Sequence, residues 1–197
     1  MINLTRNEGK ALLILFKDIT GNHNANSLSK KLGISRVGTM KMLKKLEARR
    51  LLKSKQLGKA VFYKPTLEDF YTSKIIETLL IAESREHAER WIDEFKAVYK
   101  ETEIVLLFGS ITRNQKKASD VDVVFIFKKG KYDKVRDFVS KKNKTLFKKI
   151  HEIPQTIRDL KDNLRDGNKA MLDAVRTGYV LHGQDALVKV IKNVTGF

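Results

Sequence analysis

The sequence predicts an α/β (α+β) protein: a basic helical module with a β-hairpin, a helical connector, and a mixed β-sheet with flanking helices. Three observations support this class. Charge is divided into blocks along the 197 residues, helical apolar spacing dominates the first half, and long β-branched apolar runs appear only after residue 100. We expect the three parts to span residues 1–66, 67–100 and 101–197.

The balance of charge indicates a polyanionic partner. The chain has 40 Lys and Arg residues against 23 Asp and Glu residues, a net charge of +17. Residues 1–66 carry +12, residues 67–103 carry −5 and residues 104–197 carry +10. Basic blocks of this size favour nucleic acid as a partner.

Several classes of protein are excluded by composition. The chain has no cysteine, which excludes a disulfide scaffold, a Cys-ligated zinc site and a thiol nucleophile. Four scattered histidines do not suggest a metal cage. The longest uninterrupted apolar run, Ala11–Phe16, is too short to span a membrane. We therefore expect a soluble, cytoplasmic protein with no membrane partner.

The first basic block has the pattern of three helices and a hairpin. Apolar spacing predicts helices over 7–17 and 28–32, the second capped by Ser27 and ended by Gly33, and a third that Ser35 caps. In the third helix, Val37, Met40, Leu43 and Leu46 follow three-residue steps, and we expect Leu43 to Leu46 to pack against the core. The side chains expected largely on the opposite, exposed face are Arg36, Thr39, Lys41, Lys44 and Lys45. Two strands, 51–55 and 60–64, are predicted around 57–59.

This order of elements resembles the winged helix-turn-helix superfamily. The resemblance covers roughly sixty residues and is carried by the stretch SLSKKLGISRVGTMKMLKKLEARRLLKSKQLGKAVFYKPT. It implies binding to double-stranded DNA, with the third helix in the major groove and the hairpin along the backbone. The residues implied near base edges or adjacent phosphates are Ser35, Arg36, Thr39 and Lys41. Those implied at phosphates are Lys44, Lys45, Lys55 and Lys59. One departure is Arg49-Arg50, where relatives commonly have glycine.

The acidic stretch 67–100 is expected to be a connector. Its apolar residues return at three- or four-residue steps, which predicts one long helix or two shorter ones. We interpret Trp91 and Phe95 as core residues. Two roles remain open for this stretch, pairing with its copy in a homodimer or packing on the second module.

The second basic block carries residues suited to chemistry. A buried strand is predicted over 103–108, Gly109-Ser110 follows it, and Asp120 and Asp122 lie in a second apolar strand. Residues two apart in a strand share a face, so the two carboxylates project together. A divalent cation with a preference for oxygen ligands, such as Mg²⁺, would relieve their repulsion. The backbone N–H groups and hydroxyl of the Gly-Ser turn suit phosphate.

These motifs resemble the DNA polymerase β-type nucleotidyltransferases. The stretch LLFGSITRNQKKASDVDVVFIF is similar to the minimal nucleotidyltransferase domains of prokaryotes, and LKDNLRDGNKAMLDAVRTGYVLHG resembles their closing helix and strand. The resemblance implies transfer of NMP, with AMP the first candidate, from an NTP, with ATP expected, to a hydroxyl. It implies that Gly109 and Ser110 hold the triphosphate, that Arg113 touches phosphate, and that Asp120 and Asp122 bind Mg²⁺.

Active members of that family use a third carboxylate from a later strand as a base. The matching stretch here, residues 147–153, offers only Glu152. If Glu152 shares a face with Ile150, it points into the core rather than at the metals. The sequence leaves this register open.

Two functions therefore remain open. The chain is an enzyme that transfers a nucleotide to a protein or small-molecule hydroxyl, with DNA binding used for autoregulation, as in an antitoxin whose toxin is a separate chain. Alternatively, it is a transcriptional regulator whose degenerate nucleotidyltransferase domain is a nucleotide sensor or scaffold. Arg176 and His182 match the spacing of a ribonuclease dyad, but residues 178–183 are expected to form a strand and turn, so we attribute that match to chance.

Overall fold

The computed structural model describes residues 3–195 and divides into two compact units, residues 1–79 and 80–197. The boundary falls inside helix α4, Phe70–Phe95, which is interrupted at Ala88 (φ −139°, ψ 22°). The residues of the expected connector, 67–100, are thus divided between the two units.

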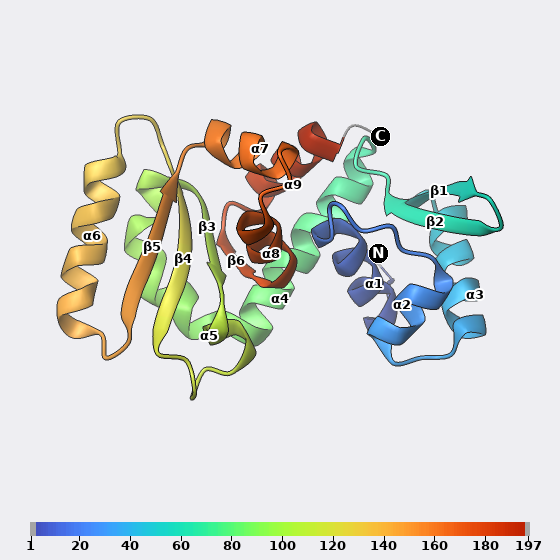
Figure 1. Ribbon diagram of the computed structural model, residues 1–197, viewed down its shortest axis with the longest axis horizontal. Helices are drawn as coiled ribbons and strands as arrows, with labels where there is room; N and C mark the ends of the chain where they lie inside the picture. The colour runs from blue at the N-terminus through green and yellow to red at the C-terminus, as the bar shows by residue number, and fades with distance from the viewer. Residues whose placement is uncertain (1–2, 196–197) are drawn as a thin grey trace. The chain divides into compact units, whose positions relative to one another are not determined.

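The first unit contains three helices and a hairpin in the predicted order, followed by the start of α4 (Figure 1). The elements are α1 (Arg6–Lys17), α2 (Ala25–Leu32), α3 (Arg36–Ala48), β1 (Leu52–Leu57) and β2 (Ala60–Pro65). The two strands pair antiparallel, and Gly58 turns the chain between them with φ 59°. His23 adds one bridge to Tyr63.

Helix termini in this unit follow side-chain capping. Ser35 caps α3 by accepting a hydrogen bond from the Gly38 N–H, and Gly33 ends α2 with φ 67°, both as predicted. The prediction that Ser27 caps α2 is wrong. Asn24 is the N-cap and Ser27 is its capping-box partner, so the helix begins three residues earlier.

The buried face of α3 contains Leu43 and Leu46, as predicted, but also Thr39, which was predicted to be exposed. Val37 and Met40 are 58% and 41% exposed, whereas Thr39, Leu43 and Leu46 are wholly buried. A step of three residues falls about 60° short of a helical turn, so three such steps from Leu46 reach the opposite side of the helix. Thr39 tolerates burial because its hydroxyl donates to the Ser35 carbonyl oxygen at 3.0 Å.

Arg49-Arg50, where members of the winged helix-turn-helix superfamily commonly have glycine, lies at the end of α3. The helix ends at Ala48, and Arg50 has φ 59°, the left-handed conformation that glycine adopts most easily. Arg50 is the one residue other than glycine with positive φ among residues 3–195.

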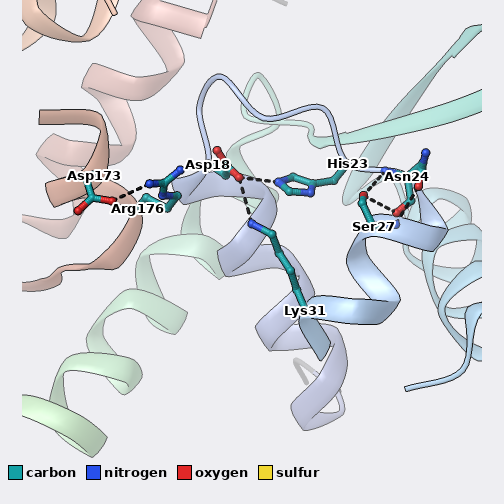
Figure 2. A network of polar contacts seen from close by, with 7 residues as sticks. All are labelled: Asp18, His23, Asn24, Ser27, Lys31, Asp173 and Arg176. Atoms are coloured by element: carbon teal, nitrogen blue, oxygen red, sulfur yellow. Dashed lines mark hydrogen bonds and ion pairs between the residues drawn. The ribbon is translucent and has the colours of Figure 1, made fainter. Parts of the chain in front are cut away.

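A polar network ties the end of α1 to α2. Asp18 accepts from His23 Nε2 at 2.7 Å and from Lys31 Nζ at 3.2 Å, and its side chain is only 12% exposed (Figure 2). Burial raises the pKa of the Asp18 carboxyl, but the hydrogen bonds from His23 and Lys31 outweigh it, so the pKa is lowered overall.

The second unit is built on a four-stranded mixed sheet of order β5-β4-β3-β6 (Figure 1). Its strands are β3 (Thr102–Phe108), β4 (Asp120–Phe127), β5 (Lys149–Gln155) and β6 (Tyr179–His182). β4 pairs antiparallel with β3 and parallel with β5, and β6 pairs antiparallel with β3. The helical segments are η1 (Lys96–Glu101), α5 (Ser110–Arg113), α6 (Tyr132–Thr145), α7 (Ile157–Arg165), α8 (Lys169–Thr177) and α9 (Gln184–Thr195). This arrangement confirms the predicted fold class.

The sheet of the second unit buries an apolar core against its helices. On one face, Trp91 and Phe95 of α4 pack with Val121, Val123 and residues of α6. Trp91 is 3% exposed and Phe95 is fully buried, which confirms their interpretation as core residues. Residues 178–183 form β6 and its turn, also as predicted. Within residues 3–195, none of the helices combines the length and apolarity that a bilayer crossing requires.

We predict that Asp18→Asn destabilises the first unit by about 1–3 kcal/mol at pH 7, because it removes the charge on which His23 and Lys31 converge. The Asp18 pKa is depressed on folding, so its contribution is present above the unfolded-state pKa and is lost as the pH falls through the folded-state value. Melting temperatures of wild type and variant should therefore differ at pH 7 and converge as the pH falls below the unfolded-state pKa of Asp18 and through its lowered folded-state pKa. A difference that is constant with pH would contradict this assignment.

Candidate functional site

The candidate site of the second unit lies where β3 ends and β4 begins. Asp120 opens β4, and Asp122 is the register partner of Phe108, the last residue of β3. The Gly109-Ser110 turn follows Phe108 directly, so strand pairing brings the turn beside Asp122. Asp120 lies on the same face of β4 as Asp122, because side chains alternate along a strand.

Gly109 is fitted against the Asp122 carboxylate. Its backbone has φ 80° and ψ −151°, a conformation open essentially to glycine alone. A Cβ atom at this position would lie 2.1 Å from Asp122 Oδ2, far inside van der Waals contact. The Asp122 carboxylate therefore occupies the space that any side chain at residue 109 would need.

The turn continues into the short helix α5, which holds Ser110 at its first position. The Thr112 hydroxyl donates to the Gly109 carbonyl oxygen at 2.9 Å, and Ile111 is buried in the core of the sheet. These contacts fix the backbone on both sides of Ser110. Arg113, at the end of α5, is exposed.

A histidine neighbours the carboxylate pair on the other side. β5 pairs with β4 so that Lys149 is opposite Asp120 and His151 is opposite Asp122. His151 Nδ1 lies 3.0 Å from Asp122 Oδ1, and its side chain is 69% exposed. The sequence did not single out His151, because its place beside Asp122 depends on the pairing register of two strands 29 residues apart.

Glu152 lies on the opposite face of the sheet from the two aspartates. Its register partner is Val123, which is wholly buried in the apolar core. Glu152 Oε2 is buried without a hydrogen-bond partner. Burial raises the pKa of its carboxyl, and the nearby Arg136 lowers it less. The structure therefore does not bring Glu152 together with Asp120 and Asp122.

The donor set suits a cation that needs few protein ligands. Asp120 and Asp122 offer carboxylate oxygens on one face, and no group of three His, Asp or Glu side chains within residues 3–195 is arranged to enclose a metal ion. Mg²⁺ fits such a pair, because it commonly binds one or two carboxylates and completes its shell with waters and substrate phosphates.

Comparison with known families agrees with this geometry. Residues 84–169 match the family model described as "Nucleotidyltransferase domain". The match contains the Gly109-Ser110 turn, both aspartates and His151. A nucleotidyltransferase domain is thus supported for the second unit, and its candidate site is the edge of the sheet described above.

Other comparisons add little. No curated protein matches the chain. Three solved structures of Lactococcus lactis ZitR variants match with a TM-score of 0.34. The first is 22% identical and covers 50% of this chain, and this chain covers 62% of it, less than two thirds. The second is 18% identical, covering 73% of this chain and 76% of its own. Likeness at this level carries no inference about fold or function.

The residues predicted to bind DNA lie in the first unit. Some are exposed cations, and others are buried or make contacts within the unit. Arg36, Lys41 and Lys44 are exposed on α3, and Lys55 and Lys59 are exposed on the hairpin. Three further residues of the predicted set have structural roles within the first unit. Ser35 caps α3, Thr39 is buried, and Lys45 pairs with the buried carboxylate of Glu8 at 2.8 Å.

We predict that Gly109→Ala is more destabilising than Gly130→Ala. Both glycines have positive φ, but a Cβ atom at Gly130 meets nothing within 4 Å, whereas one at Gly109 collides with Asp122. The control should lose about 1 kcal/mol through backbone strain, and the variant should lose clearly more. The measurement is chemical unfolding of both proteins. Equal losses would show that the Asp122 carboxylate moves aside freely.

Proposed function

We propose that the nucleotidyltransferase domain binds a Mg²⁺–NTP complex at Gly109, Ser110, Asp120 and Asp122, and transfers NMP to an acceptor hydroxyl. The observation that carries this proposal is the fit of the Asp122 carboxylate against Gly109, because it combines a phosphate-binding turn and a metal-binding carboxylate in one structure. We further propose ATP as the nucleotide, AMP as the group transferred, and Arg113 as an additional phosphate contact.

Each residue has a definite role in this proposal. Asp120 and Asp122 would hold Mg²⁺, which supplies positive charge to the triphosphate when bound. The backbone N–H groups at Gly109 and Ser110 and the Ser110 hydroxyl would orient the phosphates. His151, in the register position beside Asp122, is the residue we assign to accept the proton of the acceptor hydroxyl. Glu152, which faces the core, is not assigned that role.

One observation favours a second candidate function. His151, and not a third carboxylate, neighbours the aspartate pair, and active relatives use a carboxylate there. The domain would then bind nucleotide without transferring it, and the chain would be a DNA-binding regulator with a nucleotide sensor or scaffold. The enzyme and the nucleotide sensor both require nucleotide binding and differ in turnover, whereas a scaffold requires neither.

We predict that Mg²⁺ and ATP together raise the melting temperature of the wild type by several degrees. A ligand at a hundredfold excess over its Kd stabilises the folded protein by about 2.7 kcal/mol. The variant Asp120→Ala/Asp122→Ala should lose this shift, and Glu152→Gln should keep it. Absence of a shift with any NTP would refute a nucleotide site.

Turnover separates the two candidates. Incubation with α-labelled ATP and acceptor should label the acceptor with wild type and fail with the double variant. If the thermal shift is present and no acceptor in protein, small-molecule or nucleic-acid fractions is labelled, the regulator is the correct function.

We propose that the first unit is a winged helix-turn-helix domain that binds double-stranded DNA. Its charge of +12 over residues 1–66 and the exposed cations of α3 and the hairpin support this role. Autoregulation of its own gene, with a toxin as a separate chain, is the biological setting we propose. The exposed Val37 and Met40 lie among these cations and offer apolar contact to bases.

We predict that Arg36→Ala and Lys59→Ala each weaken binding to duplex DNA and lower the slope of log affinity against log salt by about one. Lys10→Ala, which removes an exposed lysine from α1, is the matched control and should change neither. Fluorescence anisotropy with a labelled duplex over a salt series measures both quantities. Equal effects of all three variants would mean that attraction is diffuse rather than localised on α3 and the hairpin.

A further inference from the structure

The loop between α6 and β5 places a bare aromatic ring beside the candidate active site. Phe147 in this loop is 97% exposed, the highest value among the exposed large apolar side chains of the described residues. The next residue but one, Lys149, is the register partner of Asp120. The loop therefore lies at the end of the sheet where β4 begins and where the Gly109-Ser110 turn leaves β3.

The exposure of Phe147 is built into a well-anchored loop. Asn143 of α6 accepts from the Ile150 N–H at 2.7 Å and donates to the Ile150 carbonyl oxygen at 3.1 Å. Lys149 Nζ donates to the carbonyl oxygens of Asn143 and Leu146 at 2.6 Å and 3.1 Å. Leu146 itself packs against the core. Because Leu146 and Lys149 are held in place on either side, the backbone keeps the Phe147 side chain in solvent. Exposure of its apolar surface to water is unfavourable.

The surroundings of Phe147 are strongly cationic. Residues 138–151 contain five lysines and no acidic residue. Lys148 Nζ donates to the Ala118 carbonyl oxygen, which joins this loop to the segment between α5 and β4. That segment and the end of α5 add three exposed cations, Arg113, Lys116 and Lys117. The acidic residues among 109–122 are Asp120 and Asp122, which bound metal would neutralise, and Glu94 pairs with Lys142 of the lysine run at 2.7 Å.

A small cavity adjoins the ring. It has a volume of about 130 Å³, equivalent to roughly four water molecules, and is lined on one side by Phe147 and Lys148. Arg90, Trp91, Ile111, Gln115 and Leu146 complete its lining. A planar group stacked on Phe147 would lie next to an apolar wall and to side chains that form hydrogen bonds.

We propose that this loop binds single-stranded nucleic acid, with a base stacked on Phe147 and phosphates at Lys144, Lys148 and Lys149, and that the strand is the acceptor of the transfer. An exposed aromatic ring within a run of cations is the combination that binds unpaired bases and a phosphate backbone together. The proposed function assigns the free nucleotide to the Gly109-Ser110 turn, and a protein partner is the contrary outcome of the test below.

The acceptor half of this inference rests on the proposed function. In the transfer, a hydroxyl oxygen of the strand bonds to the α-phosphorus of the NTP. The bond from that phosphorus to the oxygen bridging to the β-phosphate breaks, pyrophosphate leaves with the electron pair, and the hydroxyl proton passes to His151 and from there to solvent. The binding half needs neither nucleotide nor metal and is tested without them.

The binding test compares variants of the full chain by fluorescence anisotropy with labelled twelve-nucleotide oligo(U) and oligo(dT). The two probes show whether the strand that binds is RNA or DNA. Phe147→Ala changes no charge and should weaken binding about five- to a hundredfold, the effect of losing one stacked base. Phe147→Trp should retain affinity. Phe70→Ala, which removes an aromatic that is 76% exposed in the first unit, is the control and should bind as wild type.

Duplex DNA provides the opposite comparison. Phe147→Ala should bind a duplex as wild type does, whereas Lys59→Ala should lose duplex affinity and keep oligonucleotide affinity. If Phe147→Ala binds both oligonucleotides within twofold of wild type, the loop is not a strand site and its partner is of another class, such as a protein.

Labelling then tests the acceptor. With α-labelled ATP, the wild type should label the bound oligonucleotide, and Phe147→Ala should need a higher oligonucleotide concentration to reach the same maximal rate. An oligonucleotide that binds through Phe147 but is never labelled, in a protein that shows the Mg²⁺–ATP thermal shift, overturns the acceptor half. Absence of that shift with normal binding overturns the proposed function instead and leaves the strand site standing.

Discussion

The candidate site depends on glycine at position 109, a residue without a side chain. Because residue 109 has no Cβ atom, the Asp122 carboxylate can lie directly against the backbone of the turn that leaves β3. The same position needs φ 80°, so glycine is required twice, once by the backbone conformation and once by the space. The antiparallel pairing of Phe108 with Asp122 delivers the carboxylate to that space. Strand register, turn conformation and the position of the Asp122 carboxylate are therefore fixed by the same few atoms.

The sequence predicted features that depend on local chemistry. The Ser35 cap, the end of α2 at Gly33, the strand after residue 101 and the shared face of Asp120 and Asp122 all follow from a residue and its near neighbours along the chain. The burial of Thr39 in α3 was not predicted because Thr39 is a polar residue, yet its hydroxyl is satisfied by the Ser35 carbonyl oxygen one turn earlier.

Features that depend on long-range pairing could not be predicted in the same way. Whether His151 or Glu152 lies beside the aspartates is decided by a register between β4 and β5, and a slip of one residue would exchange them. The sequence between the two strands, which includes all of α6, carries no information on that register. The burial of Ile150 and of Val123 on the same face is what selects it, and burial is a property of the folded sheet.

The position of β5 has a consequence for assembly. It is the last strand of the sheet on its side, and a strand in that position exposes backbone groups to which another chain can pair. Pro154 lies within β5 and has no N–H to donate, and a proline inside a sheet is confined to such border strands. Together with the charge of Lys149, it discourages a second sheet from extending this one. The second unit is thus protected from ordered aggregation along β5.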